Sequence, residues 1–271
     1  MKYFGVLRRF VILPLIVLRL LIWWEQKRGK TPPEHLQNWQ EDKVLIGHAL
    51  TAVAYTTPWD NYLVASGVWN YDHNLVNGFK IGWVPIEEYN FFWLQSLLTG
   101  SWLQFLSRHI NTDQEAANPN TYPLARVIVT GGLGIIWLQQ FRDLIMYRER
   151  TRYLNLILSW ALPPIMLQTA FGGDILWKYR KLVATSIITS TAYLGYIDSL
   201  AIGSGTWHII PEKTIQWEVI DNLPFEELLF FFLTNVLLTF GVTLVQAKES
   251  ETRLPAFLKA RYQEFKRRWN K

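Results

Sequence analysis

The sequence has no cysteine among its 271 residues. This absence excludes disulfides, thiolate-bound metals and cysteine nucleophiles. The five histidines do not fall at the spacings of a metal-ligand set, so we expect no metal site.

Motifs that bind phosphate or nucleotide are also missing. The chain has no Asp-Asp-x-x-Asp cluster, which argues against the diphosphate–magnesium site of the usual prenyltransferases. No Gly-x-Gly-x-x-Gly stands at a strand-to-helix turn, and Gly131-Gly132-Leu133-Gly134 lies inside an apolar run, where it indicates close packing. We therefore expect neither flavin nor nicotinamide, and no other cofactor.

Charged residues are nearly absent from several long stretches, although half of the chain is apolar. About 20 apolar residues cross the hydrocarbon core as a helix, which satisfies its own backbone groups. The segments of this kind are Phe10–Trp24, Val44–Ala65, Ile86–Leu106, Ala125–Phe141, Leu154–Phe171, Leu182–Ile202 and Pro224–Val245. The sequence thus predicts an all-α, polytopic membrane protein with about seven transmembrane helices.

The basic residues give only a weak indication of orientation. Loops on the two sides of the membrane carry equal numbers of Lys and Arg, whereas eight of the 27 lie in the tail from Lys248 to Lys271. This tail favours a cytoplasmic C-terminus. It indicates a segment that faces solvent or lipid headgroups, and the net charge of +5 is no sign of nucleic-acid binding.

The chain resembles itself after a shift of 138 residues. The shift aligns Trp39 with Trp177, Lys43 with Lys181, Tyr55 with Tyr193, Asp60 with Asp198, and Ser66-Gly67-Val68-Trp69 with Ser204-Gly205-Thr206-Trp207. One further residue aligns Pro85-Ile86-Glu87-Glu88 with Pro224-Phe225-Glu226-Glu227, and Phe91-Phe92 with Phe230-Phe231. Matches of Trp, Asp, Gly and Pro at a nearly constant offset indicate a duplication.

The duplication predicts the layout of the chain. We expect a first three-helix repeat over residues 1–110, a linker with the fourth helix over 111–150, a second three-helix repeat over 151–247 and a basic tail over 248–271. Four spans separate equivalent positions, so both repeats cross the membrane in the same direction, related by a pseudo-two-fold axis along the membrane normal. Both Pro-x-Glu-Glu motifs then lie at one membrane face.

Each third helix is expected to have Pro in its first turn, followed by two glutamates that the helix dipole favours. A good helix start would explain this pattern, but the pair recurs and Phe-Phe follows one turn deeper. Glu88 and Glu227 share their helix faces with deeper polar residues, which usually face the bundle interior. We therefore rank them above Glu87 and Glu226, and expect one ionised surface glutamate and one protonated inner glutamate in each pair.

Two further pairs match across the repeat. Asp60 and Asp198 end the second helices, where an Asp is often a cap or an Arg partner. Trp69 and Trp207 begin the following loops. They are either interfacial anchors or an aromatic wall that stabilises a cation.

These residues resemble a known family. Tyr55-Thr56-Thr57-Pro58-Trp59-Asp60, Gly67-Val68-Trp69-Asn70-Tyr71 and Pro85-Ile86-Glu87-Glu88 through Phe92 are similar to the first half of the non-flavin lycopene β-cyclases, which are heterodimers in some bacteria and fused chains in archaea and fungi. Gly205-Thr206-Trp207 and Leu223-Pro224-Phe225-Glu226-Glu227 through Phe231 are similar to the second half. The second copy departs from the first in having Tyr196-Ile197-Asp198 where the first has Pro58-Trp59-Asp60.

The resemblance implies an enzyme that forms β-ionone rings at the acyclic ends of a carotenoid by proton-initiated, non-redox carbocation cyclisation. It implies catalytic carboxyls at Glu88, Glu227, Glu87, Glu226, Asp60 and Asp198, with the general acid drawn from Glu88 or Glu227. The aromatic residues expected to bind substrate are Trp69, Trp207, Phe91, Phe92, Phe230 and Phe231. The expected partners are a lipophilic polyene that enters from the bilayer and the membrane lipids; a homo-oligomer is left open.

Two other functions fit the same residues. The same cation chemistry could cyclise or hydrate another polyprenyl chain. A proton-coupled transporter would also combine repeats with intramembrane acids, although such carriers usually show inverted repeats and broken helices near the midplane. The sequence does not specify the ring type or whether both ends of the substrate react.

Overall fold

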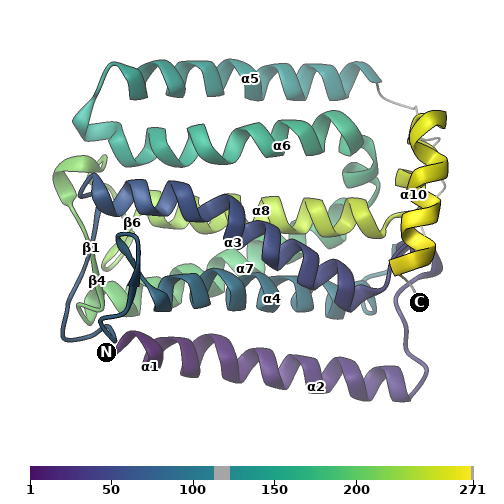
Figure 1. The fold of residues 1–271 in the computed structure, drawn as a ribbon, viewed down its shortest axis with the longest axis horizontal. Helices are drawn as coiled ribbons and strands as arrows, with labels where there is room; N and C mark the ends of the chain where they lie inside the picture. The colour runs from purple at the N-terminus through teal and green to yellow at the C-terminus, as the bar shows by residue number, and fades with distance from the viewer. Residues whose placement is uncertain (113–122, 270–271) are drawn as a thin grey trace.

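The computed structural model describes residues 1–112 and 123–269, and within them long helices run side by side as a bundle (Figure 1). The helices are α1 (Tyr3–Leu7), α2 (Leu13–Lys27), α3 (Glu41–Ala65), α4 (Ile86–Ser107), α5 (Pro123–Ile145), α6 (Arg152–Lys178), α7 (Arg180–Gly203), α8 (Phe225–Gln246), α9 (Lys248–Thr252) and α10 (Ala256–Trp269). A π-helical stretch, Arg8–Ile12, joins α1 to α2.

The all-helical prediction is confirmed, because all seven predicted apolar segments lie in these helices to within a residue. The segment Glu149–Lys178, together with α5 and α8, is long and apolar enough to cross a membrane by length and composition. Of the linker predicted for residues 111–150, residues 113–122 lie outside the described part of the chain.

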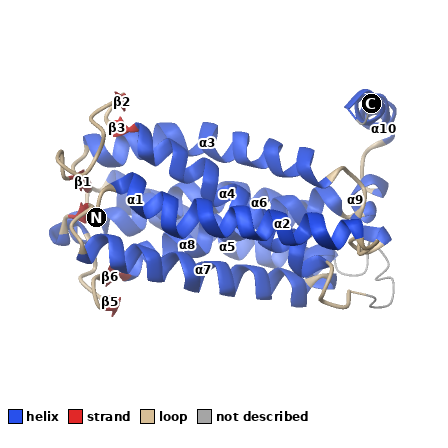
Figure 2. Ribbon diagram, turned by 90° about the horizontal axis from the view of Figure 1, so that it is seen from below, coloured by secondary structure: helices blue, strands red, loops and turns tan. Residues whose placement is uncertain are grey.

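Short strands gather at one end of the bundle (Figure 2). They form three antiparallel pairs: β1 (Trp69–Tyr71) with β4 (Trp207–Ile209), β2 (Lys80–Ile81) with β3 (Val84–Pro85), and β5 (Glu218–Ile220) with β6 (Leu223–Pro224). The first pair links the segment after α3 to the segment after α7. These strands lie over the starts of α4 and α8.

The position of the motif prolines differs from the prediction. Pro85 and Pro224 are the last residues of β3 and β6 and stand one residue before α4 and α8. Their ψ angles of 150° and 145° are extended. The expectation of Pro in the first helical turn was wrong because each Pro still belongs to the strand pair that leads into the helix.

The two helices that carry the glutamates meet inside the bundle. Thr99 of α4 donates a hydrogen bond of 2.9 Å to Asn235 of α8. Asn235 in turn donates to Thr191 of α7 at 3.2 Å. Polar side chains inside a bundle of apolar helices usually join helices in this way, so these bonds fix α4, α7 and α8 relative to one another.

The basic tail is folded at the opposite end of the bundle from the strands (Figures 1 and 2). Within it, α10 lies across the start of α3, and Tyr262 accepts a hydrogen bond of 2.5 Å from the indole of Trp39. Phe257 and Phe265 stay exposed on this helix. The tail therefore combines a packed contact with an open apolar and basic surface.

Candidate active site

Four carboxyl groups are buried together beneath the strands. Asp60, Glu88, Asp198 and Glu227 are each at most 4% exposed. Glu88 lies within electrostatic range of the other three. Burying several acids is costly unless each is protonated or hydrogen-bonded. Such a concentration of acids inside a helical bundle indicates a functional site.

Tyrosine hydroxyls hold the second glutamate of each motif. Tyr3 and Tyr71 both donate to Oε2 of Glu88, the latter at 3.2 Å. Tyr153 donates to Oε1 of Glu227 at 2.6 Å. Burial and the neighbouring charge of Glu88 hold the pKa of Tyr71 well above its usual range. Tyr71 in β1 therefore remains a hydroxyl donor at neutral pH.

The first glutamate of each motif holds a loop. Oε1 of Glu87 accepts a hydrogen bond of 2.6 Å from the backbone N–H of Asn77, and Oε1 of Glu226 accepts one of 2.7 Å from that of Ile215. Both glutamates are buried. The expectation of an ionised surface glutamate in each pair was wrong, because the loop before each helix folds over its first turn.

The two aspartates have fewer partners than the glutamates. Oδ1 of Asp198 accepts a hydrogen bond of 2.9 Å from the indole of Trp207. Neither carboxyl oxygen of Asp60 has a hydrogen-bond partner among the described residues. Within that part of the chain, neither aspartate caps a helix or forms an ion pair, so the alternative of a cap or Arg partner fails for both.

Aromatic rings enclose the carboxyls. Trp69 is buried and packs edge-on against Phe230 with ring centroids 5.9 Å apart, while the ring of Trp207 lies 4.8 Å from that of Tyr3. Pairing of β1 with β4 brings the two tryptophans under the same strands. Their contacts are those of interior residues, and the alternative of interfacial anchors does not describe Trp69.

The four phenylalanines of the motifs meet between α4 and α8. Phe91 lies 6.1 Å from Phe231, and Phe92 lies 6.4 Å from Phe230, measured between ring centroids. The structure thus brings together all the predicted aromatic residues and all the predicted carboxyls at one end of the bundle.

Sequence reasoning missed the three tyrosines. A signal existed for two of them: Lys2-Tyr3 and Arg152-Tyr153 stand 150 residues apart (153 − 3), as do Pro14 and Pro164 (164 − 14). The shift of 138 residues hides this match because the second copy has 12 more residues (150 − 138) before its second helix. Trp160, which stacks on Trp59 at 4.6 Å, was also missed.

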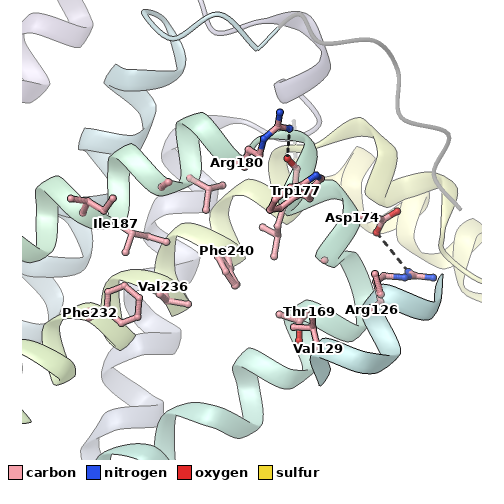
Figure 3. A pocket seen from close by; sticks show the side chains of 16 residues that line it. Arg126, Val129, Thr169, Asp174, Trp177, Arg180, Ile187, Phe232, Val236 and Phe240 are labelled. Atoms are coloured by element: carbon pink, nitrogen blue, oxygen red, sulfur yellow. Dashed lines mark hydrogen bonds and ion pairs between the residues drawn. The ribbon is translucent and has the colours of Figure 1, made fainter. Parts of the chain in front are cut away.

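The largest cavity lies away from the carboxyls. It measures about 710 Å³, lies between α5, α6, α7 and α8, and is walled by Ile187, Phe232, Val236 and Phe240 (Figure 3). Arg126 and Asp174 form an ion pair of 3.9 Å at its edge. None of the four clustered carboxyls lines this cavity, so its size does not identify it as the reaction site.

Comparison with known proteins supports the resemblance. No protein-family model matches the chain, and no solved structure matches it. A lycopene beta-cyclase of Halobacterium salinarum is 37% identical over 193 residues, which cover 71% of this chain and 78% of that protein.

Fungal proteins match over a similar part of the chain. A bifunctional lycopene cyclase/phytoene synthase of Podospora anserina is 33% identical over 196 residues, covering 70% of this chain and 32% of that protein. One of Aspergillus oryzae is 28% identical over 236 residues, covering 86% of this chain and 38% of that protein. The chain thus spans about a third of these fungal relatives but most of the archaeal one. It belongs to the lycopene beta-cyclase family.

Proposed function

We propose that this protein cyclises the acyclic ends of lycopene or a related carotenoid to β-ionone rings. The observation that carries the proposal is the cluster of four buried carboxyls among aromatic rings, in a chain 37% identical to a lycopene beta-cyclase. Carboxyls supply and remove protons, and aromatic faces stabilise a cation. The reaction has no net oxidation, in keeping with the absence of a nucleotide-binding motif from the sequence.

The hydrogen bonds suggest how the carboxyls divide the work. A buried carboxyl that faces no donor is favoured as the neutral acid, which describes Asp60. A carboxyl that accepts tyrosine hydroxyls is favoured as the anion, which describes Glu88 and Glu227. This assignment moves the general acid from the glutamates, as expected from sequence, to Asp60. Separate environments for paired carboxyls are a usual basis for acid and base roles.

The steps of the reaction follow from these roles. Asp60 gives its proton to the terminal double bond, and the tertiary cation that results is attacked by a double bond further along the chain. A new carbon–carbon bond closes the six-membered ring and moves the positive charge into it. Glu88 or Glu227 then takes a proton from a ring carbon, which restores a double bond. Transfer of that proton back to Asp60 completes the cycle.

The first glutamates have a positioning role in this proposal. Glu87 and Glu226 each hold the backbone of a loop that covers the site. They fix the start of the helix on which Glu88 or Glu227 stands. Their substitution is therefore expected to affect folding more than the chemical step.

The proposal includes an arrangement in the membrane. All seven predicted segments would cross the bilayer, with residues 1–110 and 151–247 as two parallel copies and residues 248–271 as a cytoplasmic tail. Pairs of equivalent contacts support the copies. The backbone N–H of Ile86 bonds to the carbonyl of Phe79, as that of Phe225 does to Trp217, and the hydrogen bonds of Glu87 and Glu226 form a second such pair.

Expression in a lycopene-accumulating host tests the function. Wild-type protein should convert the red acyclic pigment to cyclised products that chromatography resolves, and Asp60→Asn should lose at least about a hundredfold in product, within the range for a general acid. Asp143→Asn is the matched control, because Asp143 is a buried aspartate paired with Arg142 outside the cluster. Hydroxylated products, or uptake of protons without new polyenes, would identify a hydratase or a transporter.

Single variants then separate the roles of the carboxyls. Glu88→Gln and Glu227→Gln should each reduce product formation more than Glu87→Gln does. If Glu88→Gln is no more harmful than Glu87→Gln, the role given to the second glutamate is wrong. If Asp60→Asn keeps full activity, the acid is one of the glutamates.

A further inference from the structure

A cleft of about 200 Å³ opens between α3, α4, α6 and α8. Its wall includes Tyr55, Phe92, Trp160 and Leu237. Several of its polar side chains are bonded within the bundle: Gln95 donates to Thr234 at 3.3 Å, and Gln168 donates to the carbonyl of Leu237 at 2.9 Å. The cleft therefore suits an apolar chain better than a polar ligand.

A second cleft of about 380 Å³ lies between α2, α4 and α7, and it corresponds to the first by the repeat. Equivalent residues line the two: Thr51 and Thr189, Tyr55 and Tyr193, Leu237 and Leu98, Pro164 and Pro14. Even a hydrogen bond is repeated, since Tyr55 donates to the carbonyl of Trp160 and Tyr193 to that of Phe10, both at 2.9 Å. The two copies of the repeat thus build two related clefts.

Only the first cleft adjoins a box of aromatic rings. Trp59 stacks on Trp160 at 4.6 Å and on Phe230 at 5.5 Å, and Trp69 meets Phe230 edge-on at 5.9 Å. The sequence shifts of 138, 150 and 139 residues place Ile197, Phe10, Phe91 and Trp207 at the equivalent positions. The second copy has therefore replaced both stacked tryptophans, and the repeat has diverged where the rings gather.

The box stands between the cleft and the acids. Trp160 lines the cleft, and the Trp59 that it stacks on precedes Asp60 in the chain. On the other side, Trp69 lies 5.8 Å from the ring of Tyr153, which bonds to Glu227. An apolar chain end that entered the cleft would meet the rings first and the carboxyls next.

We propose that the cleft between α3 and α6 admits the end of the polyene, and that Trp59, Trp160 and Phe230 stabilise its carbocation during ring closure. The inference rests on the proposed function and gives it one cyclisation centre, although the chain carries two copies of the motif. The two ends of a substrate react there in turn. A molecule with one ring has to leave the cleft and return by its other end.

The size of the cleft agrees with the entry of one end. Pockets that enclose a whole small ligand usually measure roughly 300–1,000 Å³, and this cleft is smaller. The rest of a long polyene would extend from the cleft between α3 and α6 into the surrounding apolar phase.

Repeat-matched variants provide the test of the centre. Trp160→Leu should reduce total ring formation at least about tenfold, because an indole face stabilises a desolvated cation strongly. Phe10→Leu, the same change in the other copy, should stay within about threefold of wild type. Trp160→Phe should recover part of the loss. Equal effects of Trp160→Leu and Phe10→Leu would overturn the single centre.

Blocking variants test the entrance without relying on turnover. Thr51→Trp fills the first cleft and Thr189→Trp fills the second. The readout is the amount of lycopene that co-purifies with each protein, with thermal unfolding as the check on folding. Thr51→Trp should lower the bound pigment at least about fivefold and Thr189→Trp should not, since occupancy falls with the blocked volume.

The two proposals fail in different ways. Wild-type protein that binds lycopene in a Thr51→Trp-sensitive manner but forms no ring would refute the proposed function and leave the entrance standing. Ring formation with bound pigment that is insensitive to Thr51→Trp would refute the entrance alone.

Discussion

The hydroxyl of Tyr153, at the start of α6, donates a hydrogen bond of 2.6 Å to Oε1 of Glu227, in the first turn of α8. The two residues are 74 positions apart and both are buried. The bond joins the first and third helices of the second proposed repeat at the carboxyl cluster. Tyr3 makes the corresponding bond to Glu88 in the first.

Removal of that hydroxyl should affect the reaction. In Tyr153→Phe, Glu227 loses a donor, and a hydrogen bond to a charged group contributes about 1.5–3 kcal/mol. We expect a fall of about tenfold or more in ring formation, measured by chromatography of pigments from the lycopene host. Tyr179→Phe is the control, because Tyr179 donates to Glu249 at 3.1 Å at the opposite end of the bundle. Equal losses in both variants would show a general effect of a missing hydroxyl.

Glu226 should prove more important for stability than for chemistry. Glu226→Ala leaves the backbone N–H of Ile215 without its acceptor, at a cost of about 1–3 kcal/mol. We expect a lower midpoint of thermal unfolding in detergent. Glu226→Gln keeps an acceptor oxygen and should restore most of the midpoint. A Gln variant as unstable as the Ala variant would mean that the charge, rather than the hydrogen bond, holds the loop.

The Asn235 amide should contribute to the packing of α8 against both α4 and α7. Asn235→Ala removes the bonds to Thr99 and Thr191, and interhelical bonds in membranes contribute about 0.6–2 kcal/mol each. The unfolding midpoint should fall accordingly. Asn90→Ala is the comparison, because Asn90 bonds only to the carbonyl of Ile86 in its own helix among the described residues. A larger loss in Asn90→Ala would contradict the assignment.

Stability should depend on pH through Glu249 in α9. Burial opposes ionisation of this carboxyl, but hydrogen bonds from Lys178 and Tyr179 outweigh it and lower its pKa below the usual value. The unfolded chain then binds the proton more readily, so stability rises with pH across the interval between the folded and unfolded pKa values. The contribution is complete above the unfolded pKa of about 4.3 and is lost as the pH falls through the folded pKa.

Unfolding midpoints at pH 7 and at about pH 3.5 provide the measurement. Acid should lower the midpoint of wild-type protein more than that of Glu249→Gln, whose side chain cannot take up the proton. Identical pH responses would exclude Glu249 as the titrating group.

Much of the architecture is readable from the sequence because helices in a membrane satisfy their own backbone groups. Apolar runs separated by charges place all seven segments correctly, and the matched motifs identify the carboxyls and rings of the site. The position of Pro85 was misread because a two-residue strand pair leaves no clear pattern in sequence. The burial of Glu87 was misread because it depends on a loop bond, which follows from tertiary structure alone.

The tyrosines show a different limit. Tyr3 and Glu88 are 85 residues apart, and no periodicity links a residue in the first helix to one in the fourth. Tyr71 follows Trp69 by two positions in a strand and so lies on the same face, yet its contact with Glu88 depends on how β1 meets α4. Residues of a site that come from different helices need the packed structure to be recognised as neighbours.

The pairing of β1 with β4 has a consequence for the length of the segments that precede these strands. Side chains alternate between the two faces of a strand, so a shift of one residue turns each of them to the opposite face. Gly67 and Gly205, with φ angles of 67° and 70°, set the direction of the chain just before the strands. A single residue inserted after either glycine would turn Trp69 or Trp207 outward and bring Val68 or Thr206 toward the acids, so this stretch should tolerate substitution far better than any change in length.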